Sequence, residues 1–410
     1  MGQPSGNFTL ALRADDLARI AQLAGEKIGS HPFLTALADD PDLSTGTELD
    51  VSLDARPLDN GSRGTIGING VIGGTRIEVR DRFEGKPQDW RELVHELSVK
   101  LEQPQSLVLA QQLALPVLPV EGPGPVSVDS EVSGSVAGGL ELSLDVSAPQ
   151  SDLSLRGGAG PDAEGSYGKP ELNLSVTAAS GDIEPWLQMA GYPLPGTGLG
   201  TPLSLSSDLF ASQGRYQAEN LVGQYSGVAV SGAIQVDTSA NPRPRITGNL
   251  ETEHLSLPLF AELVLGNGTV AGDPLIATQE MVDTEFGSSM LGGLDGTLSL
   301  WADSAPIHET QALSQFSGEL TLLDGAVSMQ QIGAEWLGGS LSGSVSLKNI
   351  EQGALADAQL RLEGADIGRI VQMTGVEAVL SGVADVTASL EANGRSLKAM
   401  VTGVSGSGVV

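Results

Sequence analysis

The heptapeptide LELSLDV at residues 140–146 decides the fold class. Leu140, Leu142, Leu144 and Val146 occupy every second position, and Glu, Ser and Asp fill the positions between them. Successive side chains of a β-strand point to opposite faces of a sheet. The stretch therefore predicts a strand with one apolar face and one polar, solvated face.

The same period of two recurs along the chain. Apolar residues in equivalent positions are Val228, Val230, Ile234, Val236, Leu341, Val345 and Leu347. Turn-forming pairs such as Asn60-Gly61 and Asp324-Gly325 bound the alternating runs, and such pairs favour tight hairpins between antiparallel strands. The pattern predicts a mostly β protein in which the sheet is antiparallel.

Short helices are predicted between the strands. Three segments share one pattern: an Asp, then apolar residues at helical spacing, then a Gly. They are residues 16–25, 182–191 and 366–375. We interpret the acidic residues as structural helix caps, because an Asp side chain accepts the free amides of a first helical turn. These caps are Asp16, Asp182 and Asp366.

The length of 410 residues exceeds what one ordinary core needs, which predicts either several domains or an elongated repeat array. We predict three β-rich units, residues 1–118, 119–266 and 267–410. The first contains helices near 16–25 and 88–112, the second a helix near 182–191 and the third a helix near 366–375. The helix over 88–112 is predicted from the spacing of Trp90, Leu93, Leu97 and Leu101.

Composition excludes several classes of function. The chain has 51 acidic against 21 basic residues, a net charge of −30, so it would repel a phosphate backbone and no nucleic-acid partner is expected. It has no cysteine, which removes disulfides, thiolate nucleophiles and Cys-ligated zinc. No apolar run is long enough to span a bilayer. We expect a soluble chain whose membrane tether, if the parent protein has one, lies in a segment absent from this chain.

The sequence contains no recognisable catalytic or metal-binding motif. His95-Glu96 begins like a zinc-protease motif, but Val99 stands where the second histidine is required. We therefore expect no catalytic residues, no metal and no cofactor, and a protein that is not an enzyme. A β-helical carbohydrate enzyme is a weaker alternative, and aromatic residues at 4% disfavour it because sugar clefts usually offer stacking platforms.

Several motifs resemble the AsmA family of Gram-negative envelope proteins, which includes TamB-like members. The motifs are GRYQAENL at 214–221, GVAVSG at 227–232, PRITGNLE at 244–251, GELTL at 318–322, WLGGSLSG at 336–343 and LEANGRS at 390–396. The likeness corresponds to an internal to C-terminal segment of a longer family member.

The resemblance implies an elongated β-sheet that curls into a groove with an apolar interior. It implies a periplasmic protein associated with the inner membrane, which transfers phospholipid between the two membranes. It also implies roles in outer-membrane biogenesis and assembly and in regulating protein targeting to the membrane. Phospholipid acyl chains and envelope proteins would be the partners. The residues expected to line the groove are Leu140, Leu142, Leu144, Val146, Val228, Val230, Ile234, Val236, Leu341, Val345 and Leu347.

The same alternation also fits a second architecture. Two sheets closed face to face would bury every apolar position and leave no ligand site. The protein would then be a closed β-repeat scaffold or adhesin that acts through protein contacts alone. An accessible apolar sheet face would indicate the open groove, and its absence would indicate the closed scaffold.

Overall fold

The computed structural model describes residues 6–28, 31–162, 165–191, 200–240, 243–256, 264–265, 285–286, 293–308, 311–350, 353–373 and 381–409. Two compact units are present: unit 1 extends to Gln213 and unit 2 begins at Gly214. The predicted boundary near residue 118 falls inside unit 1, and the one near 266 borders residues outside the described part. The three-unit division stays a prediction.

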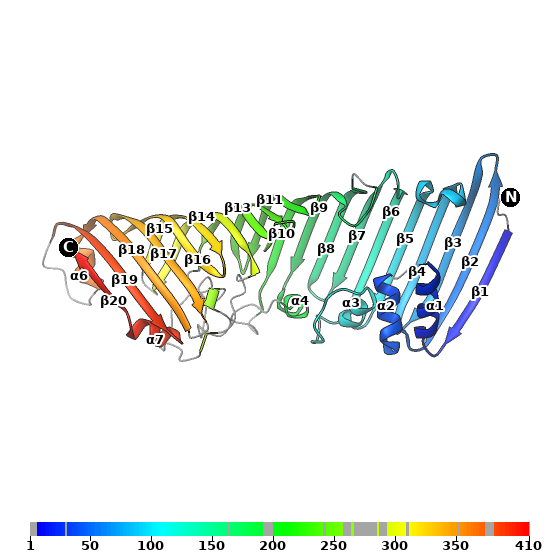
Figure 1. Cartoon of the computed structure of the whole chain (residues 1–410), viewed down its shortest axis with the longest axis horizontal. Coiled ribbons are helices and arrows are strands. Elements are labelled where there is room, and N and C mark those ends of the chain that lie inside the picture. Colours follow the sequence, from blue (N-terminus) through cyan, green and yellow to red (C-terminus); the bar gives the residue numbers. More distant parts are fainter. Residues whose placement is uncertain are drawn as a thin grey trace. The chain divides into compact units, whose positions relative to one another are not determined.

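In the described part of unit 1, ten strands form the sheet, and each pairs antiparallel with the next along the chain (Figure 1). Their bounds are β1 Gly6–Ala14, β2 Thr47–Leu58, β3 Gly61–Ile72, β4 Thr75–Gly85, β5 Val94–Gln103, β6 Val126–Ser135, β7 Gly139–Ala148, β8 Ser151–Gly160, β9 Glu171–Ser180 and β10 Leu203–Ser212. Four of these connections, β2–β3, β3–β4, β6–β7 and β7–β8, are tight hairpins, as the alternating sequence predicts.

The helices of unit 1 lie mainly at one end of these strands, as Figure 1 shows for α1 to α4. The helices are α1 Ala18–Ile28, α2 Pro32–Asp39, η1 Pro41–Ser44, η2 Pro87–Glu92, α3 Ser106–Gln112 and α4 Glu184–Met189. The 3₁₀ segment η2 connects β4 to β5 at the opposite end. The two ends of the strands are therefore built differently.

The described part of unit 2 also contains ten strands, and all described pairings but one are antiparallel. The elements are β11 Arg215–Tyr225, β12 Val228–Asp237, β13 Arg245–His254, β14 Asp295–His308, β15 Gln311–Leu323, β16 Ala326–Trp336, β17 Gly339–Ile350, β18 Gly353–Asp366, α6 Ile367–Met373, β19 Val383–Gly394, α7 Leu397–Thr402 and β20 Ser405–Val409. The exception is β13 with β14, which are parallel.

The predicted fold class is confirmed, because the described residues are mostly β and form largely antiparallel sheet with short helices between the strands. The predicted hairpin at Asp324-Gly325 is also present between β15 and β16. Both residues have positive φ, 53° and 73°, which a type I′ turn requires. The local turn chemistry thus agrees with the strand pairing.

The predicted helix over 88–112 is wrong. The segment contains η2, then the ten-residue strand β5, and only then the short helix α3. Leu97, Val99 and Leu101 fit the alternation of a strand, and Leu97 and Leu101 also fit the spacing of a helix. Pairing with β4 on one side and β6 on the other satisfies the backbone of β5 along its whole length, and this tertiary context decides the conformation.

All three predicted cap residues accept hydrogen bonds from first-turn amides. The amide of Ala18 donates to Asp16 over 2.9 Å, that of Glu184 to Asp182 over 3.0 Å, and that of Gly368 to Asp366 over 2.7 Å. Asp182 also accepts the amide of Thr201, over 3.1 Å. These contacts satisfy donors that the start of a helix leaves free.

Candidate functional site

The strand register of unit 1 gathers its apolar residues on one face. Leu142 on β7 lies directly opposite Val132 on β6 and Gly157 on β8. Opposed residues in a sheet share a face, so the pairings define a row across all ten strands. The row is Phe8, Leu53, Ile66, Asp81, Leu97, Val132, Leu142, Gly157, Leu174 and Leu209.

Three parallel rows complete this surface, which we call the apolar face of unit 1. The row through Leu144 is Leu10, Val51, Ile68, Val79, Val99, Ser130, Leu144, Leu155, Val176 and Ser207. The row through Val146 is Leu12, Leu49, Gly70, Ile77, Leu101, Val128, Val146, Leu153, Ala178 and Leu205. The row through Leu140 is Gly6, Ala55, Gly64, Phe83, His95, Gly134, Leu140, Ala159, Leu172 and Ala211.

The apolar face of unit 1 is accessible over much of its extent. The predicted residues Leu140, Leu142, Leu144 and Val146 are all half-buried. At the β1 edge, Phe8 is exposed. The inward residues of a closed sandwich are packed between two sheets. Half-buried side chains across the sheet of unit 1 therefore favour an open sheet over a closed sandwich for this unit.

The opposite face of unit 1 is covered with charge. Arg63 Nη2 lies 2.6 Å from Glu84 Oε2, and Lys100 Nζ lies 2.9 Å from Asp129 Oδ2. Hydrogen bonds from Arg156 and Ser154 hold the pKa of the Asp145 carboxyl below its ordinary value. The hydrogen bond with Asp129 raises the pKa of Lys100. Cross-strand pairs of opposite charge stabilise a solvated sheet face.

One hydrogen-bonded polar pair interrupts the apolar face of unit 1. Asp81 and His95 lie on neighbouring strands, β4 and β5, and His95 Nδ1 is 2.9 Å from Asp81 Oδ2. Their side chains are 14% and 28% exposed. Across the described strands of unit 1, no other residue in the four rows carries a titratable side chain. This pair was not predicted from the sequence, where the only signal for it is that Asp81 and His95 stand in phase with the apolar residues of their strands.

The helical end of unit 1 is closed by a small core and a buried polar network. Leu17, Ala21, Leu37, Leu43 and Ile72 form the core against which Leu12, Leu49 and Ile77 of the sheet pack. Beside it, Gln112 accepts a hydrogen bond from Thr75 over 2.6 Å and donates to the carbonyls of Leu43 and Ile72, over 2.7 and 3.0 Å. Gln103 donates to Thr75 over 2.7 Å.

In unit 2 the predicted lining residues have mixed environments. Val228, Val230, Ile234 and Val236 on β12 are half-buried. Val345 is 36% exposed, whereas Leu341 is only 6% exposed and belongs to the largest buried cluster of the described residues. Leu347 is partly buried against that cluster.

A buried core covers much of the apolar side of the unit 2 sheet. It includes Phe316, Leu320 and Ile332 from the strands and Val264 from a segment outside them. Leu265 and Met400 belong to a second buried cluster. Leu341 is therefore a core residue and not an accessible lining residue, because other parts of unit 2 pack over this part of the sheet.

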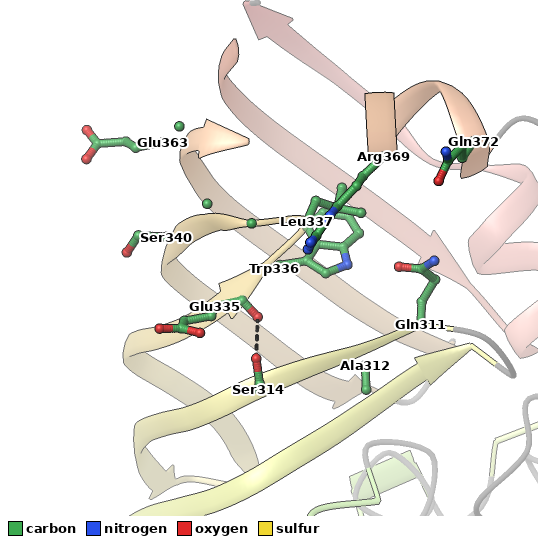
Figure 2. A pocket seen from close by; sticks show the side chains of 13 residues that line it. Gln311, Ala312, Ser314, Glu335, Trp336, Leu337, Ser340, Glu363, Arg369 and Gln372 are labelled. Carbon is green, nitrogen blue, oxygen red and sulfur yellow. Dashed lines mark hydrogen bonds between the residues drawn. The ribbon is translucent and has the colours of Figure 1, made fainter. Parts of the chain in front are cut away.

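Unit 2 also has a polar cleft of about 940 Å³ at the turn between β16 and β17. Its lining includes Gln311, Ser314, Trp336, Leu337, Arg369 and Gln372. Figure 2 shows Arg369 reaching from α6 towards Trp336, with Gln311 on the facing strand. Trp336 Nε1 is buried and has no hydrogen-bond partner in the described part of the chain. This cleft was not predicted from the sequence, although the motif at 336–343 supplies part of its lining.

Comparisons with known proteins returned nothing: no family model, no curated protein and no solved structure matches the chain. Within the described residues, no group of three or more His, Asp and Glu side chains is placed to hold a metal ion. The helices described here also include none with the length and hydropathy of a membrane span.

Proposed function

We propose that the apolar face of unit 1 binds the acyl chains of phospholipids. The observation that carries this proposal is the set of four apolar rows, half-buried in large part, that cross ten strands with one polar pair, Asp81 and His95, among them. With strands about 4.8 Å apart, ten strands present a strip roughly 45 Å wide. Such a strip offers room for several acyl chains.

The driving force is the removal of hydrocarbon from water. Each buried CH₂ group contributes about 0.8 kcal/mol, so a 16-carbon chain gains on the order of 12 kcal/mol when fully covered. This attraction is non-directional and needs no specific residues. A surface made of Leu, Val and Ile therefore suffices for chain binding.

In the cell, we propose that the protein is a non-enzymatic, AsmA-like component of the periplasm that associates with the inner membrane. It would carry phospholipid between the inner and outer membranes, and thereby support outer-membrane biogenesis and assembly and influence protein targeting to the membrane. The sequence motifs support this wider role, and the accessible apolar face supports its lipid-binding part. Other envelope proteins would be its partners.

Native mass spectrometry of the full chain purified from a Gram-negative periplasm tests the proposal. We expect co-purified phospholipid. Leu142→Asp should reduce the bound lipid, because it places a charge in the middle of the apolar face, whereas Ser143→Asp adds the same charge to the opposite face and should leave lipid bound. A folded chain without lipid, or equal lipid in both variants, would refute acyl-chain binding by this face.

A scaffold role is the second candidate function, and the buried core of unit 2 favours it for that unit. If lipid contacts unit 1 alone, unit 1 could bind lipid while unit 2 acts as a scaffold in the same chain. Photo-crosslinking from a diazirine-labelled phosphatidylcholine distinguishes them: labelling of β12 or β17 would extend lipid binding to unit 2, and labelling confined to unit 1 would support a scaffold role for unit 2.

A further inference from the structure

The two ends of the apolar face of unit 1 differ in polarity. At the end where β5 begins, His95 and Asp81 form their hydrogen-bonded pair within the rows. At the other end, the helices and the Gln103–Thr75–Gln112 network close the face. The side-chain amide of Gln112 donates to two backbone carbonyls, so these buried groups are already engaged within the protein.

The loop at the His95 end has residues suited to a boundary between water and hydrocarbon. Trp90 is 57% exposed, and the Arg91 guanidinium lies 5.4 Å from the centroid of its ring. Lys86 precedes the same 3₁₀ segment. Tryptophan with nearby cations is typical of such boundaries, because the ring is apolar at one side and polar at the other.

This loop has a fixed position relative to the sheet. The amide of Ala137, in the β6–β7 hairpin, donates to the carbonyl of Arg91 over 2.8 Å. The cations and the tryptophan therefore stay at the end of the strands where His95 lies.

The length of the face along a strand matches an acyl chain. Six residues separate His95 from Leu101 on β5, and at about 3.4 Å per residue they span roughly 20 Å. One leaflet of a bilayer holds about half of a hydrocarbon core of about 30 Å, or roughly 15 Å. An acyl chain laid along the strands thus fits between the His95–Asp81 pair and the helical end.

We propose that each bound phospholipid lies lengthwise along the strands of unit 1, with its phosphate head at the His95–Asp81 end and its chain ends towards α1 to α3. This orientation rests on the proposed function. In its protonated form the His95 ring donates through Nδ1 to Asp81 and through Nε2 to a head-group oxygen. Lys86 and Arg91 attract the phosphate, since cations and phosphates form charge-assisted hydrogen bonds.

Site-specific fluorescence quenching tests the orientation, and the absence of cysteine makes any introduced cysteine unique. Val132→Cys and Val128→Cys place a small fluorophore at two positions of β6, near the His95 end and near the helical end. The probes are phosphatidylcholines with a nitroxide at carbon 5 or carbon 16 of one chain. We expect the carbon-5 probe to quench position 132 more strongly and the carbon-16 probe to quench position 128 more strongly.

The variants separate this inference from acyl-chain binding itself. Quenching of equal strength at both positions, or in the reverse order, would overturn the orientation and leave chain binding intact. Loss of quenching at both positions would contradict both proposals. The double variant Asp81→Leu with His95→Leu should bind lipid but lose the difference between the probes. The matched control, Lys100→Leu with Asp129→Leu, removes an ion pair from the opposite face and should keep that difference.

Discussion

His95 Nδ1 lies 2.9 Å from Asp81 Oδ2 within a surface otherwise built from apolar residues. Both oxygens of the carboxylate are within reach of this nitrogen, the second at 3.2 Å. Half-buried polar groups of this kind are tolerated when each partner satisfies the hydrogen bonding of the other. The pair is therefore a coupled unit, and removing one member has a different consequence from removing both.

We predict that His95→Leu destabilises the chain because it leaves the Asp81 carboxylate without its partner. The expected loss is about 1–3 kcal/mol, the range for an unsatisfied, partly buried polar group. Asp81→Leu combined with His95→Leu should recover most of that loss. Urea unfolding followed by tryptophan fluorescence measures both, and a double variant as unstable as the single one would show that the pair is not coupled.

The network at the helical end predicts a larger effect for Gln112→Leu. This change removes the donors of two backbone carbonyls and the acceptor of Thr75, all in a buried site. We expect a loss on the order of 3 kcal/mol, because buried groups left unpaired keep their desolvation penalty. Gln111→Leu, one residue earlier, is the control and should change the unfolding midpoint little. Equal effects of the two variants would contradict the network.

Identical leucine truncations should separate the open face from the buried core. Leu341→Ala in unit 2 removes a side chain that is 6% exposed, and should cost about 2–5 kcal/mol. Leu142→Ala in unit 1 removes a half-buried side chain and should cost clearly less. Hydrogen exchange of β7 and β17 reports on each unit separately. A larger loss for Leu142→Ala would indicate that the face of unit 1 is covered.

The ion pair between Arg156 and Asp145, on the opposite face, predicts that the stability of the folded chain depends on pH. The hydrogen bond with Arg156 lowers the pKa of Asp145 in the folded chain, so its stabilising contribution is present above the ordinary carboxyl pKa. That contribution is lost as the pH falls through the lowered value. Arg156→Gln should raise the pKa of Asp145 towards its ordinary value. Carbon-13 NMR titration of Asp side chains measures it, with Arg63→Gln as a control that should leave Asp145 unchanged.

The period of two in the sequence was enough to predict the fold class, and Asp and Gly positions were enough to place three short helices. The same local signals failed over 88–112, because Leu97 and Leu101 fit a helix as well as a strand. Only pairing with β4 and β6 distinguishes the two conformations. The prediction failed where pairing with neighbouring strands, and not the local sequence, decides the conformation.

The candidate surfaces show a similar limit. Leu142 and Leu341 stand in alternating runs that look alike, yet one is half-buried and the other is in a core. The difference arises from what packs over each sheet, which a strand's own sequence does not encode. Asp81 and His95 are 14 residues apart and meet only through strand register. The cleft at Trp336 is assembled from β15 to β18 and α6 in the same manner.

The most direct test of acyl-chain binding is equilibrium binding of a fluorescent phosphatidylcholine to the full chain, compared between Leu142→Asp and Ser143→Asp. The two substitutions add the same charge to neighbouring residues on opposite faces of β7. We predict that Leu142→Asp weakens binding at least tenfold, since charge next to hydrocarbon costs more than about 1.4 kcal/mol, while Ser143→Asp binds like the unmodified chain. Equal affinities for two folded variants would contradict the account.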